Sequence, residues 1–91
     1  MPGFVSNTTY DSSNILIVSV IASFDTNKHI KPLYVRINSG SFKIYSSWLK
    51  QSYQGLLEFQ CQIIDDDILK NLALTYHKQE NIWTIPKAFL V

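Results

Sequence analysis

The chain has 91 residues, of which 46% are hydrophobic and 16% are charged, and its formal net charge is +1. This length allows one domain with a real core, and the apolar share argues against a disordered chain. A charge so close to zero excludes an overall field that would draw the protein to nucleic acid or an anionic membrane, so such binding requires a local patch. The single cysteine, Cys61, excludes an internal disulfide framework.

Residues 1–13 are polar, contain Pro and Gly and show no period, so we expect a flexible N-terminal arm before one small β domain at 14–91. The run at 15–24, ILIVSVIASF, predicts a strand with apolar residues on both faces. It is shorter than the roughly 20 residues that a membrane-spanning helix needs. Because Lys28 is the first basic residue, no export signal is expected, which favours a cytoplasmic setting.

Residues 34–45, YVRINSGSFKIY, predict a β-hairpin, and Pro32 is expected at the start of its first strand. With Ser39-Gly40 as a two-residue turn, Arg36 pairs with Lys43 and Tyr34 pairs with Tyr45. This register places four apolar side chains on the inner face: Val35, Ile37, Phe42 and Ile44. The outer face then carries Tyr34, Arg36, Lys43 and Tyr45.

After the hairpin, we expect a connector at 46–55 with room for one helical turn. The next run, 56–64, alternates and turns Phe59 and Cys61 inward, and three aspartates at 65–67 end it. The pattern at 67–72 fits either a short helix capped by an aspartate or a strand. Further strands are predicted at 72–78 and 82–85. With six strands and short links, the fold class is all-β: an antiparallel meander forming a small barrel or half-open roll.

The outer face of the hairpin is the candidate ligand or partner face, with Trp48 extending it. Its residues are Tyr34, Arg36, Lys43, Tyr45 and Trp48. Two cations beside aromatic rings are typical of surfaces that bind a phosphate backbone and stack bases. The alternative is an ordinary solvated sheet face in which Glu58 from a neighbouring strand neutralises the two cations.

Other polar residues do not form a recognisable catalytic or metal-binding pattern. The aspartates at 65–67 are best explained by a turn, because consecutive carboxylates rarely converge on one ion. His29 and His77 are isolated in sequence, each among polar neighbours, and no Cys or His stands at zinc-ligand spacing. We therefore predict that the protein is not an enzyme and carries no cofactor or metal.

The segment IASFDTNKHIKPLYVRINSGSFKI, with LTYHKQENIWTI downstream, carries a resemblance to known sequences. Through its hydrophobic rhythm and pairs such as Phe24-Asp25, Pro32-Leu33 and Tyr76-His77, it resembles small all-β proteins encoded in bacterial genomes and mobile elements. The resemblance spans residues 18–85. It implies an all-β fold and a cytoplasmic setting, and it supplies no activity or catalytic residue.

Two apolar features predict contact with other proteins. The strand at 15–24 is apolar on both faces, and the chain ends in the apolar run IPKAFLV. Barrel closure, the N-terminal arm or a second subunit is needed to cover such surfaces. We therefore expect a protein-interaction or scaffolding module that forms homo-oligomers, and the alternative is a weak nucleic-acid-binding module that uses the outer face of the hairpin.

Overall fold

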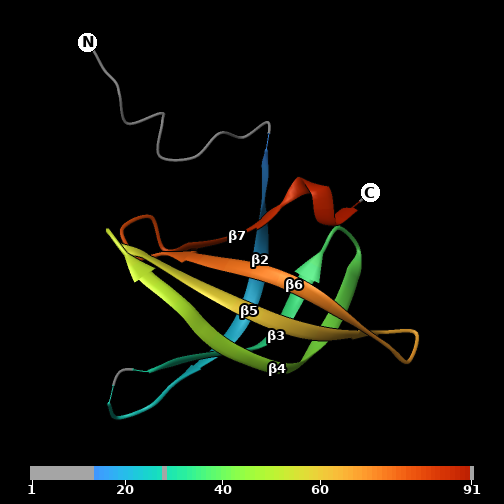
Figure 1. Cartoon of the computed structure of the whole chain (residues 1–91), viewed down its shortest axis with the longest axis horizontal. Helices are drawn as coiled ribbons and strands as arrows, with labels where there is room; N and C mark the ends of the chain where they lie inside the picture. The colour runs from blue at the N-terminus through green and yellow to red at the C-terminus, as the bar shows by residue number, and fades with distance from the viewer. Residues whose placement is uncertain (1–13, 28, 91) are drawn as a thin grey trace.

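The computed structural model describes residues 14–27 and 29–90. These residues form a closed antiparallel barrel of six strands, with a short 3-10 helix after the last strand (Figure 1). The elements are β2 (Ile15–Phe24), β3 (Ile30–Ile37), β4 (Gly40–Tyr53), β5 (Leu56–Asp65), β6 (Ile68–His77), β7 (Ile82–Pro86) and η1 (Lys87–Leu90). The predicted all-β fold and small barrel are confirmed, while the N-terminal arm expected at 1–13 lies outside the described residues.

Each strand pairs with the next one in sequence, and β2 closes the barrel by pairing with β7. The strand β2 pairs with a different strand along each part of its length: residues 15–18 pair with β7 and residues 19–24 pair with β3. The far end of the β2–β3 hairpin therefore projects from the body of the barrel (Figure 1). No helix among the described residues is long and apolar enough to cross a membrane.

The core is built from the inward side of every strand, as the alternating patterns predict. Its buried hydrophobic residues are Val18, Val35, Ile37, Ile44, Phe59, Cys61, Ile63, Leu72, Leu74, Trp83 and Ile85. Trp83 packs against two other aromatic rings, since its ring centroid lies 5.8 Å from that of Phe59 and 4.8 Å from that of Tyr76. The predicted inward faces of the hairpin and of the run at 56–64 are therefore confirmed.

The predicted turn of the β3–β4 hairpin is wrong by one residue. The turn is Asn38-Ser39, because Ile37 pairs with Gly40. Asn38 adopts a left-handed conformation with φ 55°, which asparagine tolerates well. Gly40 is not part of the turn. It packs against the Phe42 ring, and a Cβ added at Gly40 would lie 3.1 Å from that ring.

This change of turn moves each pairing by two residues along β4. Each side chain therefore keeps its predicted face, but its opposite neighbour differs. Arg36 lies opposite Ser41, and Lys43 lies opposite Tyr34. The expected pairs of Arg36 with Lys43 and of Tyr34 with Tyr45 do not form.

The connector expected at 46–55 is also wrong, because most of it continues β4. The pairing of β4 with β5 shifts between Ile44 and Ser46 and again between Leu49 and Gln51, so Tyr45 and Lys50 are the extra residues of two bulges. Each bulge inverts the alternation of the side chains and bends the strand. The regular alternation of inward and outward side chains is therefore not visible in the sequence of this stretch.

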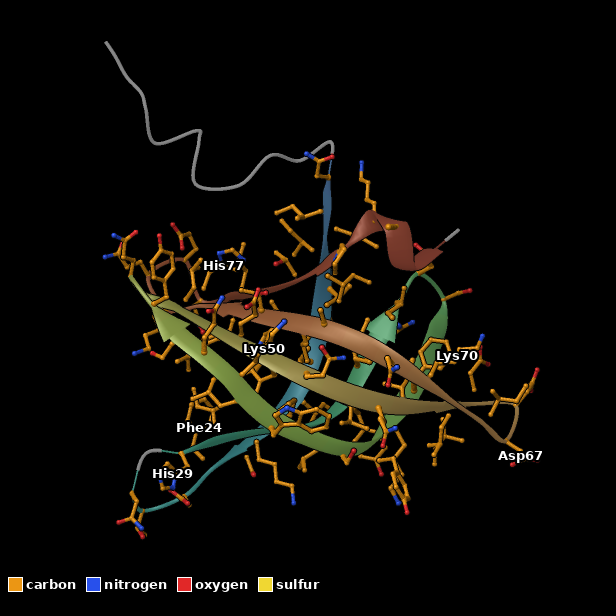
Figure 2. All side chains as sticks on the ribbon, in the orientation of Figure 1. Phe24, His29, Lys50, Asp67, Lys70 and His77 are labelled. Carbon is orange, nitrogen blue, oxygen red and sulfur yellow. The ribbon has the colours of Figure 1, made fainter. Side chains whose placement is uncertain are left out.

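The tip of the β5–β6 hairpin resolves the alternatives left open at 67–72. Asp66 and Asp67 form a two-residue turn, both with positive φ (52° and 64°), at the tip of the hairpin (Figure 2), and β6 starts at Ile68. Positive φ at both central positions is the geometry that suits the twist of a tight hairpin. The predicted turn at the aspartates is confirmed, and the following residues are strand.

Candidate functional site

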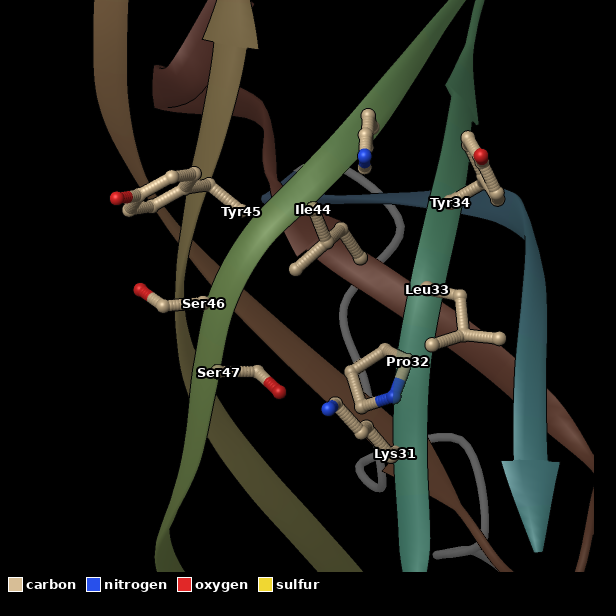
Figure 3. A pocket seen from close by; sticks show the side chains of 9 residues that line it. Lys31, Pro32, Leu33, Tyr34, Ile44, Tyr45, Ser46 and Ser47 are labelled. Atoms are coloured by element: carbon tan, nitrogen blue, oxygen red, sulfur yellow. The ribbon is translucent and has the colours of Figure 1, made fainter.

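A cleft opens where β3 and β4 separate. Their pairing runs from Ile37 and Gly40 to Tyr34 and Lys43, and the described ladder ends there. Beyond this point β4 bends at its first bulge and pairs with β5 alone. On the other side, residues 30–32 of β3 pair with β2, and Leu33 is the extra residue of a bulge in that ladder. Two strand edges therefore face each other across the cleft without being joined (Figure 3).

The cleft has two adjoining sections that share Lys31 and Ser47. The section nearer the hairpin turn has a volume of about 570 Å³, and the section towards the open end has about 440 Å³. Both volumes fall in the range of protein ligand sites, about 300–1,000 Å³. In Figure 3 the side chains of Lys31, Pro32, Ile44 and Ser47 are directed into the space between the strands.

The floor of the open-end section is apolar. Leu49 lies opposite Phe59 in the β4–β5 ladder, so both side chains are on the interior side of the sheet. Phe59 is buried, whereas Leu49 is 50% exposed because β3 no longer covers it. Leu57 and Ile30 complete this apolar lining. The cleft thus gives solvent access to the inner face of the barrel wall.

The rim of the cleft is cationic. Lys31, Lys43 and Lys78 line it, as does His29, and none of the lining residues is acidic. His29 lies beside a carboxylate already, because its Nδ1 is 3.2 Å from Asp25 Oδ2. The backbone N–H of His29 also donates to Asp25, which lowers the pKa of that carboxyl. Among the described residues, the three lysines lie beyond 4.0 Å of any carboxylate oxygen.

The sequence-predicted face is only partly assembled. Tyr34, Tyr45 and Trp48 are 44%, 63% and 53% exposed, and Arg36 and Lys43 are also exposed. Figure 3 shows Tyr34 and Tyr45 pointing away from each other on opposite sides of the cleft, so they form no common stacking platform. Tyr34 and Lys43 do share one face, as opposite residues of the ladder.

Glu58 does not neutralise the cations of the hairpin. It lies on β5 opposite Gln51 and accepts a 2.6 Å hydrogen bond from the Gln51 Nε2. Because β5 neighbours β4 and β6 but not β3, this carboxylate belongs to a different part of the sheet from Arg36.

Sequence reasoning missed most of the cleft lining, including Lys31, Ser47, Leu49 and Lys78. One signal was present, since Pro32 lacks an N–H and so marks a strand edge that is not fully paired. The bulges of β4 gave no signal in the sequence, because they interrupt the alternation of apolar and polar residues by which a strand is predicted. Leu49 and Ser47 fall in the stretch for which the sequence predicts a connector, so the sequence does not indicate that they line a wall.

Two buried titratable groups lie outside the cleft. Burial raises the pKa of the Cys61 thiol to about 12, and this side chain is fully buried. His77 was expected among polar neighbours, but it is 3% exposed and its Nε2 lies 2.8 Å from the Thr84 Oγ1. Burial lowers the pKa of His77, and the Glu80 carboxylate partly offsets this effect. Among the described residues, no three His, Cys, Asp or Glu side chains are grouped to hold a metal.

Comparisons of the chain with protein-family models, with curated proteins and with solved structures gave no match. The resemblance to small bacterial β-proteins therefore stays a prediction. The geometry and charge of the cleft between β3 and β4 are the basis for an inference about function.

Proposed function

We propose that this protein is a protein-interaction module that binds an extended segment of a partner polypeptide in the cleft between β3 and β4. One observation carries the proposal: two separated strand edges border a cleft whose floor is the apolar inner wall of the barrel. An exposed edge offers main-chain donors and acceptors to an added strand, and pockets beside it select side chains.

The size of the cleft suggests a short contact. Residues 30–32 give the β3 edge three regular positions before the bulge at Leu33, which span about 10 Å in a strand. A contact of this length buries less than the roughly 1,200 Å² typical of stable protein complexes, so we expect a transient complex. Apolar side chains of the partner would cover Leu49, which is half-exposed in the free protein.

A single-stranded nucleic acid is the second candidate ligand. Lys31 and Lys43 line the same section of the cleft, and the exposed rings of Tyr34 and Tyr45 flank it. Two phosphate contacts give a salt slope of about −1.4 in log K against log salt for a single strand. Binding of a labelled oligonucleotide at low salt, weakened by Lys31→Gln, would favour this candidate, and no binding would remove it.

The test of the first candidate is selection from a phage library of random linear peptides, with two matched variants. Leu49→Arg places a charge on the cleft floor, and Leu69→Arg makes the same change at the tip of β6, where the leucine is 49% exposed. We expect peptides that bind the unmodified protein and the Leu69→Arg variant but not the Leu49→Arg variant. Thermal unfolding followed by circular dichroism checks that both variants fold.

The result that contradicts the proposal is equally direct. If no recovered peptide distinguishes the unmodified protein from Leu49→Arg, the cleft does not bind extended polypeptides. Trp48 gives an independent signal, because it lines the cleft and is 53% exposed, whereas Trp83 is buried. A blue shift of the exposed indole on adding a selected peptide is expected, and its absence counts against binding there.

A further inference from the structure

We infer that the bound segment alternates acidic with apolar residues and adds to the edge of β4 rather than to that of β3. This inference rests on the proposed function and names the chemistry of its partner. It is carried by the different composition of the two edges and by the charge of the cleft rim.

The β3 edge is the poorer partner for an added strand. Pro32 lies in the middle of the unjoined stretch 30–33 and has no N–H to donate. Its side chain is fully buried and lies in the space between the two strands (Figure 3). Prolines on strand edges are a recurrent means of preventing further pairing. An incoming strand therefore meets a broken row of donors on this side.

The β4 edge offers a short regular stretch instead. Residues 46–49 lie between the bulges at Tyr45 and Lys50 and keep continuous pairing with β5 on their other side. This stretch contains no proline. Because strand side chains alternate, every second residue of an added strand faces the interior side, where Ser47 and Leu49 lie. Those positions of the partner suit apolar side chains.

The remaining positions face the outer rim, where the lysines are. Lys31 extends from β3 into the space between the strands (Figure 3). Lys43 lines one section of the cleft and Lys78 lines the other. None of the three has a carboxylate within 4.0 Å among the described residues, and the lining contains no acidic residue. Lysines along a strand edge disfavour pairing with an arbitrary strand. A segment that binds here must therefore carry negative charges that compensate the lysines. Glutamate or aspartate at alternate positions supplies it.

The charge also argues against a second copy of this chain as the occupant. Pairing of two β4 edges about a two-fold axis would bring the Lys43 and Lys50 of both copies into one interface. Like charges at close approach destabilise such an interface. The acidic cluster of the chain, residues 65–67, lies at the tip of the β5–β6 hairpin and does not alternate with apolar residues.

The experiment extends the phage selection. The tightest recovered peptide is synthesised with a fluorescent label, together with a copy in which each acidic residue is replaced by its amide. Anisotropy is measured with the unmodified protein, with Lys31→Gln plus Lys43→Gln, and with Lys87→Gln. Lys87 is a matched control because it is exposed and lies in η1, beyond the end of β7.

We expect acidic residues at alternate positions of the recovered peptides. Loss of each facing lysine should weaken binding about two- to fivefold, and the Lys87→Gln variant should bind as the unmodified protein does. Added salt should reduce the difference between the acidic and amide peptides. On adding the peptide, amide hydrogen exchange should slow at residues 46–49.

Four outcomes would overturn the inference. Peptides that depend on Leu49 but show no acidic excess would refute the charge requirement while the proposed function stands. Slowed exchange at residues 30–33 in place of 46–49 would assign the added strand to β3. A dimer in light scattering that the Leu49→Arg change dissociates would make a second copy the occupant. Failure to recover any Leu49-dependent peptide refutes the proposed function and the inference together.

Discussion

Phe59→Ala is the sharpest test of the link between the core and the cleft. Phe59 is 5% exposed, its ring packs 5.8 Å from that of Trp83, and it forms part of the cleft floor. Truncation of a buried phenylalanine costs about 3–5 kcal/mol. Because the cleft gives the resulting space access to solvent and neighbouring side chains, we expect the lower end, about 3 kcal/mol.

The measurement is urea unfolding followed by far-ultraviolet circular dichroism, which does not depend on the nearby Trp83. With a slope near 2 kcal/mol per molar urea, the midpoint should fall by about 1.5 M. Leu69→Ala is the control, because Leu69 is 49% exposed, and its midpoint should change by less than about 0.3 M. A midpoint loss for Phe59→Ala as small as that of the control would refute the placement of Phe59 in the core.

The other predictions concern burial, protonation, turn geometry and association. Cys61 should react with a thiol reagent far more slowly in the native protein than in urea, because it is fully buried and its pKa is raised to about 12; equal rates would contradict this burial. Burial lowers the pKa of His77 below 6.5, so the unfolded chain binds this proton more readily, and the unfolding free energy should fall as pH drops below about 6.5. Unfolding between about pH 5.5 and 7.5 should therefore show a slope that His77→Gln reduces, and an unchanged slope would exclude His77 as its source. Asp67→Gly should raise the unfolding free energy by about 0.5 kcal/mol, since Asp67 has φ 64°, and a lower thermal midpoint would contradict it. Self-association should depend on Ile17 and Ile21, which are 60% and 65% exposed on β2, so Ile17→Asp plus Ile21→Asp should reduce the mass seen by light scattering; a monomeric mass for the unmodified protein would contradict the prediction.

Strand positions could be predicted from a continuous apolar run and from runs in which apolar and polar residues alternate. The run at 15–24 matches β2, and the run at 56–64 gives β5 with Phe59 and Cys61 inward. The turn at the aspartates was predictable because Asp tolerates a left-handed backbone and interrupts the alternation. The positions of these strands and of this turn depend on residues that are close together in sequence, so the sequence is enough to predict them.

The register of the β3–β4 hairpin was not predictable in the same way. A shift of two residues keeps each side chain on its face, so the hydrophobic pattern fits both registers equally well. The observed register packs Phe42 against Gly40, where a Cβ would come within 3.1 Å of the Phe42 ring. That contact depends on tertiary geometry, and the sequence alone offered Ser39-Gly40 as an equally good turn.

The cleft follows from the same bulges that allow the barrel to close. A barrel needs strands that bend, and β4 bends at Tyr45 and Lys50, where its pairing with β5 gains an extra residue. The first bend lies directly after the last pair between β4 and β3, so β4 turns to follow β5 and leaves residues 30–33 of β3 behind. Pro32 makes this separation less costly, because a residue without an N–H loses no donor when its neighbour departs. Removal of the Tyr45 bulge by deletion should therefore narrow the cleft and abolish peptide binding while the β5–β6 hairpin keeps its protection from amide exchange. Retained peptide binding in that variant would show that the bend of β4 does not create the site.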